Sequence, residues 1–275
     1  MMSIERKSLK QLMAAALFAV IFFLGPPHNA RSIAQVIPDA NRLAHRPSTA
    51  TEDRGGWLIA AYLGGARTSA SSLTITQPAL GSQIKFDDVR FNSRSFDGPL
   101  YYGIRGGYFI GRVPLGVEAE FIHLKVFSDP AQPVRATGAH LGGPINREIR
   151  LGEIVQQYSI SHGVNLLLFN LAGRYARGRN RDAPAGRLIF TGRFGIGPTI
   201  PHTESTIDGQ HQEQYELGRI AWQLAGGVEL HLWRGLYALG EYKFTRTRQR
   251  GKVFSGEAES LLRSHHGIFG LSYHF

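Results

Sequence analysis

The sequence contains no cysteine, which excludes a disulfide framework and any cysteine-ligated metal site. After position 25 it has no run of about 20 apolar residues, so no helix in the main part of the chain is predicted to span a membrane. A dinucleotide-binding fingerprint is also missing, because neither a third glycine nor a helical pattern follows Gly195 and Gly197. Acidic residues number 21 against 31 lysines and arginines, and the formal net charge of +10 favours anionic partners.

The N-terminus has the layout of a secretory signal peptide. A basic start is followed by the uncharged apolar stretch 12–25, by two prolines, and by small residues at Ala30 and Ala34. We therefore predict a signal peptide over 1–34, cleaved near residue 30 or 34. An uncleaved anchor is the alternative, although the apolar stretch is short for a spanning helix. Residues 35–54 are polar and aperiodic, and we predict a flexible periplasmic lead-in.

From Trp57 onward the sequence alternates in polarity over long segments, which is typical of transmembrane β-strands. Eight strands are predicted, at 57–66, 100–110, 115–127, 154–175, 187–200, 218–232, 235–248 and 263–275. Long connections, at 67–99, 128–153, 201–217 and 249–262, alternate with shorter ones. This pattern indicates an all-β fold over 55–275, an eight-stranded antiparallel up-and-down transmembrane β-barrel with short periplasmic turns and long extracellular loops.

The two faces of the predicted strands differ as expected for a membrane barrel. Trp222, Leu224 and Val228 share one face of 218–232, and a polar face carries Glu229. Apolar outside and polar inside is the reverse of a soluble exported carrier. The charged residues predicted to form a lumen network are of both signs: Arg105, Glu118, Glu120, Arg193, Glu229, Glu241 and Lys243. Since eight strands leave room only for side chains, we predict a salt-bridged plug rather than a catalytic carboxylate pair or a wide pore.

Three histidines are predicted on the outward face, near the outer ends of neighbouring strands: His123, His162 and His202. Imidazole can act as a general base near neutral pH and can bind a divalent metal. Glu204 shares a face with His202 and could orient it or complete a set of metal ligands. These four residues are the candidate catalytic set. Histidines also populate the polar boundary of a bilayer without any chemistry, and that interpretation stays open.

The run TRTRQRGK at 245–252 has basic residues at two-residue intervals. On a strand this spacing places them on one face, together with Tyr242 and Phe244. The basic side chains predicted to form this strip, including two across the following loop, are Arg246, Arg248, Arg250, Lys252, Arg263 and His265. At the height of the outer-leaflet sugars such a strip would bind lipopolysaccharide, whose phosphates suit arginine. A solvated loop edge is the alternative, and export excludes nucleic acid as the partner.

Four segments, at 116–127, 160–175, 192–204 and 226–245, resemble the lipid A oxidase family of rhizobia and their relatives, small outer-membrane barrels of the OmpA-like superfamily. The motifs HLK, SHG, IPH and EYKF in these segments carry His123, His162, His202 and Glu241. The C-terminal alternation that ends on Phe275 also resembles the assembly signal of bacterial outer-membrane proteins. The resemblance implies oxidation of the proximal glucosamine of lipid A to 2-aminogluconate by molecular oxygen, with release of hydrogen peroxide.

The expected location is the outer membrane of a Gram-negative bacterium, the expected partner is outer-leaflet lipid A, and we expect a monomer. Oxidation by oxygen needs an electron route that side chains rarely supply, so a metal is expected. A site of His123, His162 and His202 with a carboxylate could hold iron, copper or manganese, whereas no nucleotide cofactor is expected. The alternative function is a non-catalytic OmpA-like structural or adhesive barrel whose loops bind external partners.

Overall fold

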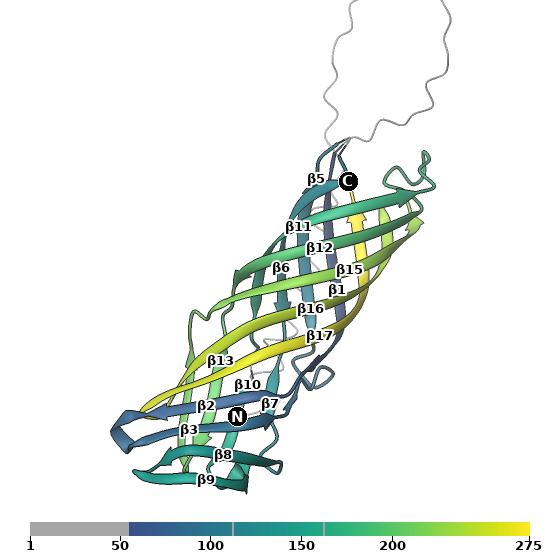
Figure 1. Cartoon of the computed structure of the whole chain (residues 1–275). Coiled ribbons are helices and arrows are strands. Elements are labelled where there is room, and N and C mark those ends of the chain that lie inside the picture. The colour runs from purple at the N-terminus through teal and green to yellow at the C-terminus, as the bar shows by residue number, and fades with distance from the viewer. Residues whose placement is uncertain (1–54, 112, 162) are drawn as a thin grey trace, which may run out of the picture. The chain divides into compact units, whose positions relative to one another are not determined.

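Figure 1 shows the computed structural model of the chain. The structure describes residues 55–275 except Arg112 and His162. The predicted signal peptide, the predicted lead-in at 35–54 and the candidate site residue His162 therefore lie outside the described residues. Within the described part of the chain, no helix is long and apolar enough to cross a membrane.

Eight antiparallel strands form a closed barrel, which the pairing of the first strand with the last completes (Figure 1). In order around the barrel they are β1 (Gly56–Thr68), β5 (Tyr102–Phe109), β6 (Leu115–His123), β11 (Leu166–Arg177), β12 (Leu188–Pro198), β15 (Ile220–Trp233), β16 (Leu236–Val253) and β17 (Gly256–His274). Each strand pairs with its neighbour in the sequence of barrel strands, so the predicted up-and-down topology is confirmed.

The outer wall of the barrel is apolar. Large exposed side chains on it include Leu63, Ile104, Val117, Phe169, Leu171, Phe194, Ile196, Leu224, Leu230, Phe269 and Leu271. They alternate along each strand with buried residues, as in β16, where exposed Tyr242 stands between buried Glu241 and Lys243. Because a water-soluble protein rarely exposes so large a continuous apolar surface, this wall faces lipid.

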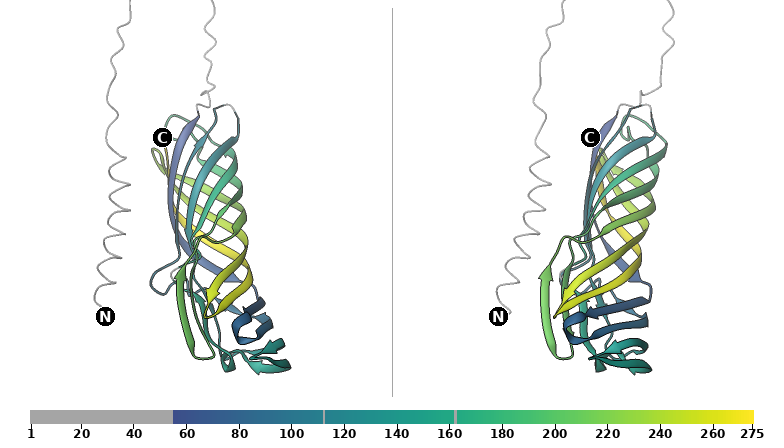
Figure 2. Two further views of the ribbon diagram at one scale, coloured as in Figure 1. Left: turned by 90° about the vertical axis from the view of Figure 1, so that its left-hand side faces the viewer. Right: turned by 60° about the vertical axis from the view of Figure 1, so that its left-hand side comes forward.

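The long connections fold into further strands at the end of the barrel opposite the C-terminus (Figures 1 and 2). One set continues the barrel sheet beyond β17: β2 (Ser71–Gln77), β3 (Ser82–Val89), β8 (Pro133–His140) and β9 (Gly143–Arg150). A second sheet has the order β14 (Gln210–Tyr215), β13 (His202–Ile207), β10 (Val155–Ile160), β7 (Val126–Ser128) and β4 (Phe91–Asn92). Two short 3₁₀ turns, η1 (Pro78–Leu80) and η2 (Leu151–Glu153), complete these elements. We call β2–β4, β7–β10, β13 and β14 the head.

The head has an apolar core of its own. Both of its sheets contribute fully buried side chains, among them Leu73, Ile75, Phe86, Val155 and Ile207. This interior explains why the head is ordered as sheets although its sequence lacks the long alternating segments of the barrel. The expectation of long connections at this end of the barrel is confirmed, and most of their residues lie in paired strands.

Two predicted boundaries were wrong. The segment 154–175 is not one strand, because a turn separates β10 from β11 and places Gly163 and Asn165 at positive φ (102° and 46°). The connection 249–262 is not a loop, because β16 and β17 stay paired as far as Val253 and Gly256. β13 and β14 of the head pack against β16, so this extension of the hairpin lies beside the head.

Candidate functional site at the outer wall

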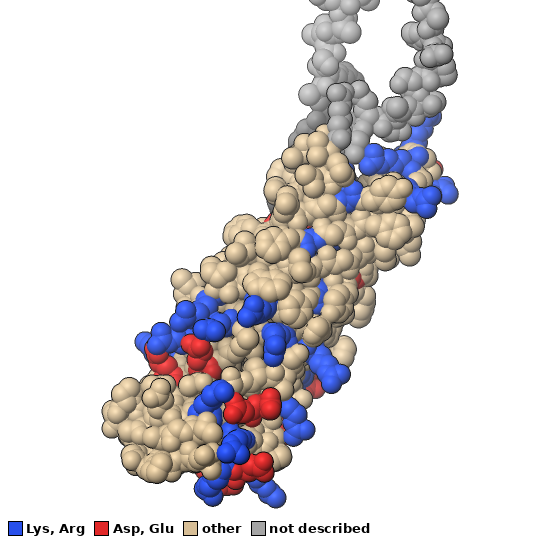
Figure 3. Space-filling view, in the orientation of Figure 1, with Lys and Arg blue, Asp and Glu red and all other residues tan. Residues whose placement is uncertain are grey.

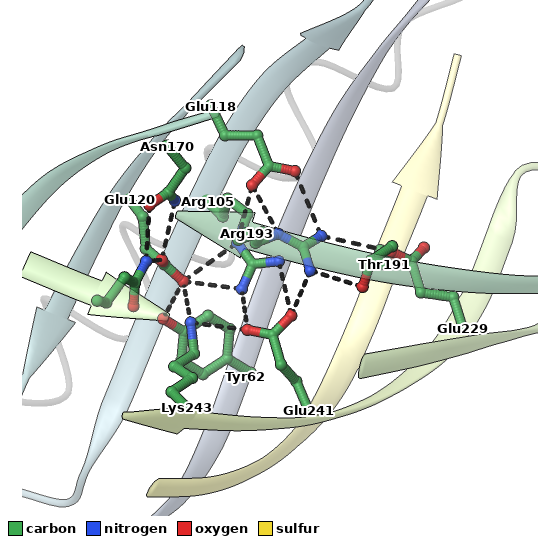
Figure 4. A network of polar contacts seen from close by, with 12 residues as sticks. Tyr62, Arg105, Glu118, Glu120, Asn170, Thr191, Arg193, Glu229, Glu241 and Lys243 are labelled. Atoms are coloured by element: carbon green, nitrogen blue, oxygen red, sulfur yellow. Dashed lines mark hydrogen bonds and ion pairs between the residues drawn. The ribbon is translucent and has the colours of Figure 1, made fainter. Parts of the chain in front are cut away.

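The barrel interior is filled by buried charged side chains (Figure 4). The residues predicted to point inward are all buried: Arg105, Glu118, Glu120, Arg193, Glu229, Glu241 and Lys243. The Arg105 guanidinium lies 2.8 Å from Glu120 and 2.7 Å from Glu241. Arg193 lies 2.7 Å from Glu118 and also pairs with Glu241. Each arginine thus joins two carboxylates from other strands, which ties opposite walls of the barrel together.

Glu120 lies at the centre of this network. Its carboxylate accepts hydrogen bonds from Tyr62 (2.6 Å), Arg105 (2.8 Å), Asn170 (3.0 Å), Gln223 and Lys243. Among the described residues of the interior, the four carboxylates are balanced by four cations: Arg105, Arg193, Lys243 and Arg174, whose guanidinium lies 4.4 Å from the centre of the Phe109 ring. A filled and balanced interior holds the barrel closed and leaves little space for a substrate.

His123 is the last residue of β6 and has the parity of the lipid-facing residues Val117 and Phe121. Its ring stacks on Tyr102 of β5, with centroids 5.1 Å apart and an interplanar angle of 19°. Its Nδ1 lies 2.9 Å from Asn165 Oδ1, while Asn165 Nδ2 donates to the carbonyl of Ile200 at 3.1 Å. Because the second bond fixes the amide orientation, His123 Nδ1 donates to Asn165. If the ring is neutral, this bond leaves Nε2 as the unprotonated nitrogen, which is the form of a base or of a metal ligand.

The turn that contains Gly163 contacts His123 and His202, the two histidines of the candidate set that the structure describes. A Cβ at Gly163 would lie 2.5 Å from His123 Nδ1, and φ there is 102°, so only glycine fits. The backbone N–H of His202 donates to the carbonyl of Gly163 at 3.2 Å. Gly163 of the SHG motif and His202 of the IPH motif therefore lie near His123 at the end of β6. The role of these histidines in a site stays a prediction.

His202 begins β13 and is buried. Its Nε2 lies 2.9 Å from the carboxylate of Glu213, and its ring centroid lies 4.0 Å from that of Tyr215. The structure thus places Glu213 on His202, where the sequence suggested Glu204. Glu204 is two residues further along the same strand, opposite Glu213. The difference arises because β14, which the sequence analysis did not anticipate, supplies the cross-strand diagonal neighbour of His202.

Within the described part of the chain, no three side chains of the ligand types His, Asp and Glu come together as a metal site. His162, the third predicted ligand, is not described, so the three-histidine site remains a prediction. His202 Nε2 faces the Glu213 carboxylate and His123 Nδ1 faces Asn165, so among the described residues His123 Nε2 is the imidazole nitrogen that a metal would use.

Sequence reasoning missed several residues around His123. Tyr102, Asn165, Glu213 and Tyr215 contact the two histidines, and none belongs to a motif that marks it as functional. Lys125 stands two residues beyond His123 in the HLK motif, which was a signal that could have found it. Its ammonium donates to the carbonyl of Asp97 at 2.8 Å, and burial lowers the pKa of its amine.

The basic strip lies on one face of the β16–β17 hairpin, as its period-two spacing predicts. Arg246, Arg248, Arg250 and Lys252 alternate with buried residues, and exposed Arg263 and His265 lie on the neighbouring β17. His265 Nδ1 is 2.5 Å from the hydroxyl of Tyr242, at the edge of the apolar wall that is nearer to the head.

Comparison with known proteins agrees with this architecture. No curated protein gave a significant match to the sequence. Among solved structures, the outer membrane protease OmpT from Escherichia coli is similar, with a TM-score of 0.42 and 10% identity over 85% of this chain and 99% of that one. That likeness is too distant to support an argument about activity. A family described as outer membrane protein β-barrel domain matches residues 58–275, which include the whole barrel except its first two residues. The chain belongs to this family of outer-membrane β-barrel proteins.

Proposed function

We propose that the protein is an outer-membrane enzyme that modifies lipid A at the outside of its wall, by the oxidation that its resemblance to lipid A oxidases implies. In this proposal it resides in the outer membrane of a Gram-negative bacterium with the head outside the cell. The observation that carries the proposal is His123 at the end of β6, which has the parity of the lipid-facing residues, is buried (6% exposed) against Tyr102, and is oriented by Asn165.

The filled lumen supports an external site. Arg105, Arg193 and Lys243 fill the interior together with the glutamates that they pair with, so an acylated lipid has no path through the barrel. The substrate is itself a membrane lipid whose sugars lie at the outer boundary of the bilayer. A base on the outside of the wall, at that boundary, is therefore the placement that such a substrate requires.

The reaction balances with oxygen as the only oxidant. The anomeric hydroxyl of the proximal glucosamine loses a proton and its carbon loses a hydride equivalent, which leaves a lactone. Oxygen takes up the two electrons and two protons to form hydrogen peroxide. Water then opens the lactone to the carboxylate of 2-aminogluconate. We assign to His123 the acceptance of the hydroxyl proton, a role that suits imidazole near neutral pH.

Hydrogen peroxide release by the purified barrel, incubated with lipid A that has a free reducing end, tests the assignment. His123→Gln should abolish release, because the amide has no basic nitrogen. His231→Gln is the matched control, since His231 lies near the end of β15, where its Nε2 donates to the carbonyl of Arg234 and not to a residue of the candidate site. Equal release from both variants would remove His123 from the mechanism, and absence of release from the wild type would refute the enzyme proposal.

The second candidate is a non-catalytic barrel whose head binds an external partner. The observation that favours it is the apolar tip of the head, where Leu141 and Phe254 are exposed beside the η1 turn. This function predicts unmodified lipid A and an adhesion phenotype that follows the head when heads are exchanged between barrels.

A further inference from the structure

The basic strip divides into a neutralised part and a part without acidic partners. Toward the head, Arg248 lies 3.6 Å from Glu259, Arg250 pairs with Glu257, and Lys252 lies 3.8 Å from Glu216. Toward the apolar wall, the basic residues of the strip lack acidic partners. Arg246 and Arg263 have no carboxylate within ion-pair distance among the described residues, and the same holds for Arg67 on the adjacent β1.

The unpartnered arginines are brought together by strand register. Arg246 and Arg263 are directly opposite each other on β16 and β17. Arg67 is directly opposite His265, which lies two residues from Arg263 on the same face of β17. Arg67 and Arg263 are therefore diagonal neighbours, about 7–8 Å apart between backbones, and all three guanidinium groups can reach one anion.

This arrangement is unfavourable without a ligand. Like charges directly opposite each other on adjacent strands destabilise a sheet, and within residues 55–275 as described no carboxylate pairs with these arginines. In the same part of the chain, the one acceptor of a hydrogen bond from their guanidinium groups is the carbonyl of Ala70, which lies 3.4 Å from Arg263. An anion held between the arginines would turn the repulsion into charge-assisted hydrogen bonds, which arginine forms bidentately with phosphate.

The position identifies the source of the anion. Trp222 is the cross-strand neighbour of Arg246, and Phe244 is that of His265, so aromatic rings of the lipid-facing wall border the arginines. Figure 3 shows basic side chains over the β16–β17 region, between the apolar wall and the mixed charges of the head. A phosphate bound between the arginines and the aromatic rings therefore belongs to a membrane lipid whose acyl chains cover the apolar wall.

We propose that Arg67, Arg246 and Arg263 form a phosphate clamp for the headgroup of a phosphorylated outer-leaflet lipid. Arg248 and Arg250, which the sequence placed in the same strip, pair with glutamates of β17 instead, and Lys252 pairs with Glu216, which lies between β14 and β15. The clamp is built on β16, β17 and β1, whereas His123 lies on β6. The proposal therefore stands or falls independently of the oxidation reaction.

Binding measurements on the full-length barrel in maltoside detergent test the clamp. The probes are bisphosphorylated lipid A, the same lipid A after phosphatase treatment, and inorganic phosphate. The clamp variant is Arg246→Gln with Arg263→Gln. The matched control is Arg248→Gln with Arg250→Gln, which removes the same charge from the same hairpin. Far-ultraviolet circular dichroism confirms that both variants remain folded.

The clamp variant should bind phosphorylated lipid A at least about tenfold more weakly than the wild type, whereas the control should change less than about threefold. Dephosphorylated lipid A should not distinguish the clamp variant from the wild type. Equal losses in the two variants would reduce the site to diffuse electrostatics and overturn the proposal. Inorganic phosphate that binds as tightly as lipid A would overturn the assignment to a lipid.

The free energy of unfolding supplies a second readout, because the effect of Arg263→Gln should have opposite signs without and with phosphorylated lipid A. Without anionic lipid, the single variant Arg263→Gln should be more stable than the wild type, since it removes the repulsion from Arg246. With phosphorylated lipid A in excess, it should be less stable, since it removes a ligand contact. The same sign under both conditions would contradict the clamp.

Discussion

Removal of the Glu120 charge should strongly destabilise the barrel. The Glu120→Gln substitution keeps the shape of the side chain but replaces one carboxylate oxygen by an NH₂ group, which cannot accept a hydrogen bond. In the structure both oxygens accept, one from Arg105 and Tyr62 and the other from Asn170. The substitution therefore loses acceptor capacity and leaves the buried ammonium of Lys243 with one counter-charge fewer.

The expected magnitude follows from the burial of this group. The side chains of Glu120 and Lys243 are 0% exposed, so solvent cannot compensate for a lost partner. Breaking a buried ion pair from one side costs about 3–5 kcal/mol. Lys243→Met alone should cost a similar amount. The double variant Glu120→Gln/Lys243→Met restores the balance between acidic and basic residues, so its cost should be smaller than the sum of the two single costs by about 2 kcal/mol.

Urea unfolding from lipid vesicles measures these free energies, with tryptophan fluorescence as the probe. Trp57 and Trp233 are exposed on the outer wall, so their emission shifts when the barrel leaves the lipid. An unchanged slope of free energy against urea shows that only stability has changed. A cost below about 1 kcal/mol for Glu120→Gln, with additive single costs, would show that the interior is hydrated and would refute the closed, desolvated network.

Two further predictions follow from the outer wall and the site. Lipids with brominated chains should quench most of the tryptophan fluorescence, because Trp57 and Trp233 face the bilayer; quenching by aqueous acrylamide instead would contradict the lipid-facing wall. Gly163→Ala should displace the His123 ring and abolish peroxide release, because the new Cβ would lie 2.5 Å from Nδ1. Gly142→Ala is its control, since Gly142 has φ 80° but open space around it, and it should cost only about 1–2 kcal/mol of backbone strain with full peroxide release.

The barrel could be predicted from the sequence because lipid outside and charge inside impose a strict period of two on every strand. In β16 that alternation runs from Tyr242 through Lys252, so the faces of the strip and of the lumen residues could be assigned from parity alone. Parity does not determine which buried charges form ion pairs with each other. The pairing of Arg193 with both Glu118 and Glu241 depends on how three distant strands face each other across the lumen, which no single strand encodes.

The head and the details of the site were less predictable for the same reason. The β13–β14 hairpin packs against β10 and the outer end of β16, so its residues are not divided into a lipid face and a lumen face. Glu213 was missed because it reaches His202 only through this hairpin. The turn at Gly163 interrupts a segment that alternates on both sides, so the polarity pattern gave no sign of the positive φ angles at Gly163 and Asn165.

Mass spectrometry of lipid A from cells that express the protein, compared with cells that do not, tests the central claim most directly. Our account predicts a new lipid A species, heavier by one oxygen atom, that appears with expression in the presence of molecular oxygen. Fragmentation should place the added oxygen on the proximal sugar. An identical lipid A profile in the two cultures, with the barrel correctly assembled in the outer membrane, would contradict the account.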